Sequence, residues 1–186
     1  MLNDTIPGTQ IKYAQSDDAF SIIRPMIELT GGLTLSQLVK ITGINGYTIA
    51  NWVNRGFIPK SVNKKYYERH VARVLIISAL KDCMSVEDID NLMVMVNGNT
   101  EDESDDIVSD SRLYDMFCRV IRNLDAITLN SRDIEKAIRN VLTDYDGEKK
   151  KVLQCALQIM VYAYISGRCL EQIDYNMEEL KKFKEV

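Results

Sequence analysis

Proline, glycine and histidine are scarce in this chain of 186 residues, which has three prolines, nine glycines and one histidine. So few turn-forming residues argue against a sandwich of many short strands and against a low-complexity chain. The single histidine, His70, has no second histidine and no nucleophile motif beside it, so it is a poor candidate for catalysis. We expect it to cap or pack, with a phosphate contact as the alternative.

Cysteine is also sparse, and its spacing excludes the common cysteine motifs. The four residues are Cys83, Cys118, Cys155 and Cys169. None of them forms a C-x-x-C pair, so neither a zinc site nor a disulfide framework is indicated. Buried thiols in a reducing cytoplasm are the expected state.

Long apolar runs and catalytic motifs are missing as well. No run is long enough to cross a bilayer, and the first residues, MLNDTIPGTQ, do not have the pattern of a signal peptide. The sequence lacks a glycine-rich phosphate loop, a nucleophile elbow and an H-E-x-x-H motif. Asp105, Asp106 and Asp110 lack the glycine and distal glutamate of a calcium loop. We therefore expect a cytoplasmic protein without membrane contact, and neither an enzyme nor a cofactor or metal protein.

Charge is distributed unevenly along the chain, although the net charge is only −4. Residues 34–81 carry eight Lys or Arg against one acidic residue, whereas residues 82–116 carry one against eleven. A basic segment inside an acidic protein indicates an anionic partner. The acidic stretch TEDESDDIVSD is interpreted as a solvated linker and helix start, although it could compete with such a partner.

The first half of the chain has clear helix signals. A helix that begins after Asp18 is expected to be interrupted near Pro25. Thr34, followed by Gln37, has the spacing of a capping box, and this second helix is expected to end at Gly43. A third helix, over residues 47–55, should end at Gly56.

Helical spacing of apolar residues continues to the end of the chain. It predicts helices near residues 70–82 and 85–96, then three more around 113–124, 131–142 and 152–165, and a separate final piece. No heptad seam extends over several repeats, so the second half is expected to be a compact bundle. The sequence therefore predicts an all-α protein.

The segment between the third and fourth helices has the pattern of a wing. Residues 57–58 and 65–67 are short and apolar or aromatic, and they bracket the polar turn PKSVNKK, which predicts two short strands. One of the adjacent tyrosines, Tyr66 and Tyr67, should pack while the other faces out. Helix, turn, helix, strand pair and helix in this order make a winged helix-turn-helix, whose second helix enters a DNA major groove.

The candidate DNA contacts lie on the third helix and directly after it. Trp52 and Ile49 should attach this helix to the core, which leaves other positions for DNA. These candidates are Tyr47, Thr48, Asn51, Arg55, Lys60, Lys64, Lys65, Tyr66 and Arg69.

The series LTLSQL, TIANWVNRGFIP, KKYYERHVARVLII and LKDCMSVEDI resembles the DNA-binding domain of MerR-type regulators. It is more similar still to an uncharacterised bacterial family, known only as a domain of unknown function and regarded as MerR-like, over roughly residues 18–180. The resemblance implies a MerR-like winged helix-turn-helix but no assigned activity. Two positions depart from the MerR pattern, since Ala50 and Lys65 stand where those regulators usually carry arginine.

These observations predict four segments. Residues 1–17 form a flexible arm, 18–97 the winged helix-turn-helix domain, 98–110 an acidic linker, and 111–186 a helical domain for dimerisation or sensing. We expect a bacterial DNA-binding transcriptional regulator that acts as a homodimer, because one short helix gives little specificity. The alternative is a protein-interaction module on the same scaffold, and an enzyme is the third and weakest hypothesis.

Overall fold

The computed structural model describes residues 5–12, 18–98, 106–124 and 130–184. Within these ranges the regular structure consists of eight helices and no strand, so this part of the chain is all-α as the sequence predicts. The helices are α1 (Ala19–Leu29), α2 (Leu35–Thr42), α3 (Gly46–Asn54), α4 (Glu68–Leu80), α5 (Val86–Asn97), α6 (Asp110–Asn123), α7 (Ser131–Val141) and α8 (Gly147–Lys184).

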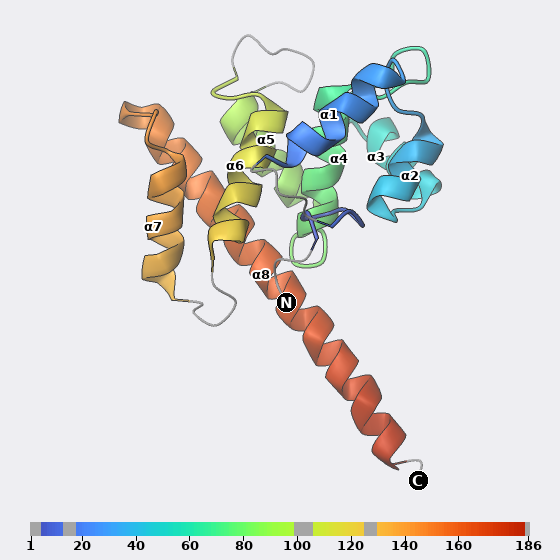
Figure 1. The fold of residues 1–186 in the computed structure, drawn as a ribbon, viewed down its shortest axis with the longest axis vertical. Coiled ribbons are helices and arrows are strands. Elements are labelled where there is room, and N and C mark those ends of the chain that lie inside the picture. The colour runs from blue at the N-terminus through green and yellow to red at the C-terminus, as the bar shows by residue number, and fades with distance from the viewer. Residues whose placement is uncertain (1–4, 13–17, 99–105, 125–129, 185–186) are drawn as a thin grey trace.

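Helix α4 forms the centre of the molecule. Every residue from His70 to Leu80 is buried, and the helix packs against α2, α5, α6 and α8. In Figure 1, α2 and α3 lie on one side of α4, and α6, α7 and the first half of α8 lie on the other. A helix that is buried on all sides must be covered on all sides, so α4 fixes the positions of its neighbours.

The two halves of the chain share this core. Buried apolar residues from Ile6 to Ile165 form one continuous cluster, and α1 packs on α6 across the predicted boundary. The predicted linker 98–110 therefore does not divide the core, although its residues 99–105 lie outside the described residues. At its end, Asp110 is the buried first residue of α6 and not part of a linker.

Helices α2 and α3 begin and end as the sequence predicts. Thr34 and Gln37 form the capping box of α2, and Gly43 ends it in the left-handed conformation. The side chain of Asn45 accepts the N–H of Tyr47 and so caps α3. Ile49, on the buried face of α3, lies four positions after this capping asparagine.

The predicted two-stranded wing is wrong for this structure. Val62 and Lys65 close a tight turn in which Asn63 and Lys64 have positive φ angles of 52° and 61°. Tyr66 pairs with Leu33, ahead of α2, and not with the segment after α3. Because the backbone groups of Tyr66 are satisfied by Leu33, the loop forms isolated bridges and no ladder.

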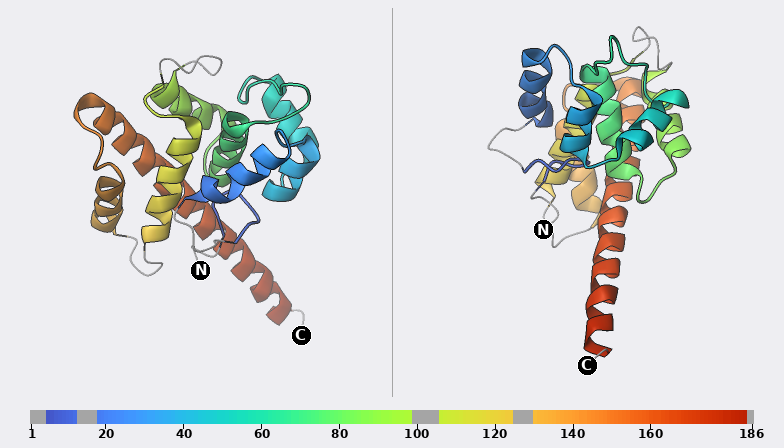
Figure 2. Two further views of the ribbon diagram at one scale, coloured as in Figure 1. Left: turned by 45° about the horizontal axis from the view of Figure 1, so that its top comes forward. Right: turned by 90° about the vertical axis from the view of Figure 1, so that its right-hand side faces the viewer.

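Two helices are longer than predicted. Helix α1 continues through Pro25, which lies on its exposed side, where water can satisfy the carbonyl group that proline leaves without a donor. Helix α8 is one helix of 38 residues and not two pieces. Its second half leaves the body of the molecule, as Figures 1 and 2 show, so the expected compact bundle is only partly formed.

Residues 5–12 pack against the body, in contrast to the predicted flexible arm. Ile6 is fully buried, and the Tyr114 hydroxyl donates a hydrogen bond to the carbonyl oxygen of Pro7. Gly8 has a φ angle of +72°, and a Cβ atom there would lie 2.4 Å from the carbonyl oxygen of Leu75. Residues 1–4 and 13–17 of the predicted arm lie outside the described residues.

No described helix combines the length and the apolarity that a membrane crossing requires.

The close approach of Gly8 to α4 makes a testable prediction. Gly8→Ala should lower the free energy of unfolding by about 3 kcal/mol, because backbone strain adds to a clash with rigid backbone atoms. Gly56→Ala is the matched control, since Gly56 also has a positive φ, +85°, but has no neighbour within 4 Å of the added atom. It should cost about 1 kcal/mol. Equal losses in urea denaturation would contradict this packing of residues 5–12.

Candidate nucleic-acid interface

The outer face of α3 carries three of the predicted contact residues. Tyr47 is 83 % exposed, Asn51 is exposed, and Arg55 follows them at the next helical turn. On the inner face Ile49 and Trp52 are buried, as predicted. Thr48 is half-buried beside this face. The structure therefore presents Tyr47, Asn51 and Arg55 together on one side of α3.

Arg55 is already engaged by neighbouring groups. Its guanidinium forms an ion pair with Glu87 in the first turn of α5 and lies over the ring of Phe57, 4.7 Å from its centroid. The pKa of Glu87 is lowered, first by a hydrogen bond from its own backbone and then by that from Arg55. Both side chains are about half exposed, so a stronger anion can reach Arg55 and replace Glu87.

Lys60 and Lys64 extend the exposed surface beyond α3. Both are exposed, and neither ammonium group has an ion-pair partner among the described residues. The carbonyl oxygen of Lys60 lies 3.0 Å from Nε2 of His70, whose Nδ1 accepts the N–H of Tyr67 at 3.2 Å. His70 thus caps α4 and holds the loop, which confirms its predicted capping role.

Three of the predicted contact residues make their contacts within the protein. Lys65 donates from Nζ to the carbonyl oxygens of Thr30 and Gly32, at 3.0 and 2.9 Å, and so holds the chain after α1. Tyr66 is only 7 % exposed, while Tyr67 is 41 % exposed. One of the two tyrosines therefore packs and the other faces out, as predicted. Arg69 pairs with the buried Asp110 at 3.4 Å.

The charge count therefore overstates the basic surface. Of the eight cationic side chains in residues 34–81, Arg73 is completely buried and Lys81 pairs with Asp82. With Lys65 and Arg69 also turned inward, the exposed cations of this segment are fewer than its sequence suggests. They are Lys40, Arg55, Lys60 and Lys64.

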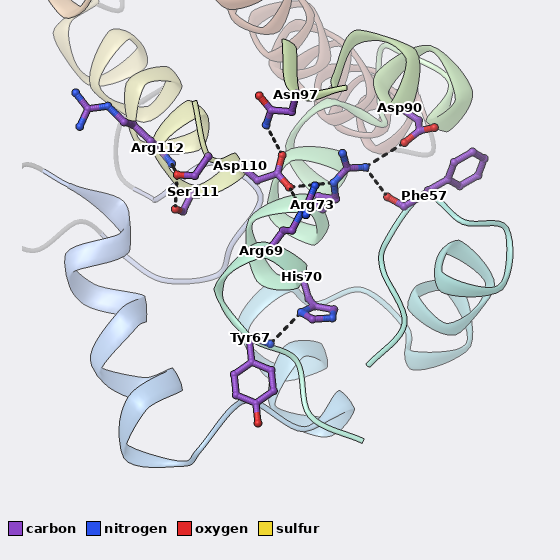
Figure 3. A network of polar contacts seen from close by, with 11 residues as sticks. Phe57, Tyr67, Arg69, His70, Arg73, Asp90, Asn97, Asp110, Ser111 and Arg112 are labelled. Atoms are coloured by element: carbon purple, nitrogen blue, oxygen red, sulfur yellow. Dashed lines mark hydrogen bonds and ion pairs between the residues drawn. The ribbon is translucent and has the colours of Figure 1, made fainter. Parts of the chain in front are cut away.

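Behind the exposed face lies a buried ion network that the sequence did not reveal (Figure 3). Arg73 of α4 donates from Nε to Asp110 at 3.0 Å, and from Nη1 to Asp90 and to the carbonyl oxygen of Phe57, both at 3.2 Å. Asn97 donates to the other oxygen of Asp110 at 2.6 Å. Arg73 thus joins the segment that follows α3 to α5 and α6.

Removing one charged member of this network should destabilise the fold strongly. The side chains of Arg73 and Asp110 are both completely buried. Burial also raises the pKa of Asp90, despite its pairing with Arg73. A charged group in such a place needs its partner, because water cannot replace it. The sequence gives no local signal for this cluster, since Arg73 and Asp110 alone lie 37 residues apart.

A polar cavity of about 490 Å³ lies between α1, α6 and α7, beside this network. Its walls include two ion pairs, Arg24 with Glu68 and Arg119 with Asp18. The pKa of Glu68 is lowered by the hydrogen bond from Arg24. In the ranges that the structure describes, no group of three or more His, Cys, Asp or Glu is arranged to hold a metal ion.

Asp115 caps α1 from a different helix. Its Oδ1 accepts the backbone N–H of Phe20 at 2.9 Å, at an end of α1 where the N-cap residue Asp18 makes no side-chain cap. Burial is the main cause that raises the pKa of Asp115 to about 6, and the nearby Asp18 adds to it. The ionised form is therefore less favourable in the folded protein than in the unfolded chain.

The burial of Asp110 leads to a prediction about stability. Asp110→Ala should lower the free energy of unfolding by about 3 to 5 kcal/mol, because it leaves the Arg73 charge buried without its main partner. Asp18→Ala also removes one carboxylate from an arginine, but at the surface, and should cost less than about 1 kcal/mol. Similar losses for the two variants in chemical denaturation would contradict the network.

Asp115 leads to a prediction about pH. Its raised folded-state pKa means that its contribution to stability is present below about pH 4 and is lost as the pH rises through about 6. Asp115→Asn keeps an acceptor for Phe20 without the charge. We expect it to be more stable than the parent by about 1 to 2 kcal/mol at pH 7.5, after allowance for partial exposure. The difference should vanish near pH 4, and a constant difference across this range would contradict the assignment.

Comparison with known proteins finds one family. The model of the family described as Domain of unknown function (DUF1836) matches residues 31–117. No curated protein and no solved structure matches the chain. The matched region runs from the turn before α2 into α6 and contains the whole ion network around Arg73. The expected similarity to a family of unknown function is thereby confirmed over these residues, while the MerR-like interpretation stays a prediction.

Proposed function

We propose that the protein is a DNA-binding transcriptional regulator whose α3 enters the major groove. In this proposal α2, the turn and α3 are the helix-turn-helix of a MerR-like domain, and the loop of residues 59–65 takes the place of the wing. The observation that carries the proposal is the outer face of α3, where Tyr47 and Asn51 are exposed and Arg55, although paired with Glu87 of α5, remains about half exposed beside them.

The side chains on this face suit the two parts of DNA recognition. Arg55 and Asn51 can form paired hydrogen bonds with base edges, and asparagine and arginine are the common partners of adenine and guanine. Lys60 and Lys64 can reach phosphates from the adjoining loop, which positions the protein without reading sequence. Arg55 must leave Glu87 to do so, and a phosphate or base is a suitable competitor for an exposed ion pair.

The position of α3 in the fold also supports the proposal. Helices α2 and α3 lie at the end of the molecule opposite α7, well away from the projecting part of α8 (Figures 1 and 2). A duplex could therefore approach α3 without meeting the second half of the chain. We propose that the regulator acts as a homodimer, so that two copies of α3 read half-sites about one helical turn apart.

Duplex binding by a double lysine variant tests the proposal. Fluorescence anisotropy with a labelled generic duplex at low salt should show binding by the parent. Lys60→Ala with Lys64→Ala should weaken it by about tenfold or more on every sequence, and reduce the salt slope by about 2, because two phosphate contacts are lost.

The matched control is Lys136→Ala with Lys149→Ala, which removes the same charge from exposed positions in the second half of the chain. It should leave the salt slope unchanged. If the parent does not bind duplex at low salt, or if both pairs of substitutions act alike, DNA recognition by this face is ruled out. The alternative, a protein-interaction module on the same scaffold, would then be favoured.

A further inference from the structure

The projecting half of α8 exposes a line of large apolar side chains. Between Gly167 and Lys184 four of them are about half exposed. They are Leu170 at 48 %, Ile173 at 56 %, Met177 at 51 % and Leu180 at 51 %. Their spacing of three, four and three residues places them on one side of the helix, as in the seam of a coiled coil. Such a seam is normally covered by a partner, because the transfer of apolar side chains out of water is favourable.

The opposite side of the projecting half is polar and satisfied within the helix. Arg168 pairs with Glu171, and Lys182 pairs with Glu179. Gln172 donates a hydrogen bond to Asn176. These contacts stabilise the helix by itself and leave its apolar side as the one that requires a partner.

The first half of α8 carries an apolar groove that the other described residues leave open. Two neighbouring hollows of about 350 and 640 Å³ follow the helix and share Cys155 and Ile159. Met95 of α5 lines one of them and is 73 % exposed, and Met84 lines the other. The groove is thus apolar along its length and runs parallel to the helix axis.

We propose that a second copy of this chain covers both surfaces, with the two α8 helices antiparallel about a two-fold axis near residue 168. The projecting half of each helix then lies in the groove of the other copy. The same helix carries the surplus of apolar side chains at one end and the open groove at the other. A two-fold axis between them pairs the two surfaces twice and closes the assembly.

One register places three of the four large seam residues opposite small ones. If residues whose numbers sum to about 336 lie opposite each other, Leu180 meets Ala156 and Ile173 meets Ala163. Leu170 then meets Ser166, and Met177 meets Ile159. Ala156, Ala163, Ser166 and Ile159 all line the groove. A parallel pairing would instead cover only the projecting halves and leave both grooves open, so the antiparallel one buries more apolar surface.

The oligomeric state of the full chain in the absence of DNA tests this interface. Sedimentation at about 10 to 50 μM should give a dimer for the parent. Ile173→Glu should give a monomer, with dimerisation weakened by about 100-fold or more, because a charge is buried in an apolar seam. Tyr175→Glu is the matched control, since Tyr175 is 60 % exposed on the other side of the same helix. It should remain dimeric.

A cysteine variant tests the direction of the helices. In a background of Cys83→Ser and Cys169→Ser, Leu180→Cys should be linked to the native Cys155 of the second copy by a short bismaleimide. When Cys155→Ser is added, the cross-linked dimer should disappear. A cross-link that persists without Cys155 indicates parallel helices, and a monomeric parent or equal effects of the two glutamate substitutions overturns the interface. The inference rests on the homodimer of the proposed function, but no DNA is present, so its failure is distinguishable from a failure of duplex binding by α3.

Discussion

The ion pair between Arg73 and Asp110 is the interaction on which the arrangement of the helices depends. Arg73 lies on the central helix, and its guanidinium contacts the segment after α3, helix α5 and helix α6 at the same time. Because the group is completely buried, it fixes the directions of these three elements more strictly than apolar contacts alone could. The exposed face of α3 is therefore held in place by a contact on its hidden side.

The same network connects the two halves of the chain, which share one core. The residues that the sequence suggests as a linker lead directly into Asp110, and this carboxylate is inserted between α4 and Asn97 of α5. Helix α1 is held to α6 in turn by Asp115 and by Arg119. Contacts from the second half of the chain thus reach the helices that carry the proposed DNA-binding face.

The sequence predicted the elements well where the signal is local. The capping box at Thr34 and the end of α2 at Gly43 depend on residues within four positions of each other. It failed where a distant partner decides the outcome. Tyr66 pairs through its backbone with Leu33, and Arg69 pairs with Asp110, and both partners are distant in the sequence. The sequence pattern does not indicate the apolar seam of α8, because Ala163 and Ser166 interrupt the run of large apolar residues.

The central claim is that the outer face of α3 and the adjoining loop form the surface that meets DNA. Chemical-shift mapping of backbone amides during titration with a generic duplex at low salt tests it most directly. The account predicts that the largest shifts fall on residues 47–55 and 59–64, with smaller ones near Glu87 as Arg55 is released. Shifts confined to α7 or to the second half of α8, or no shifts at all, would contradict it.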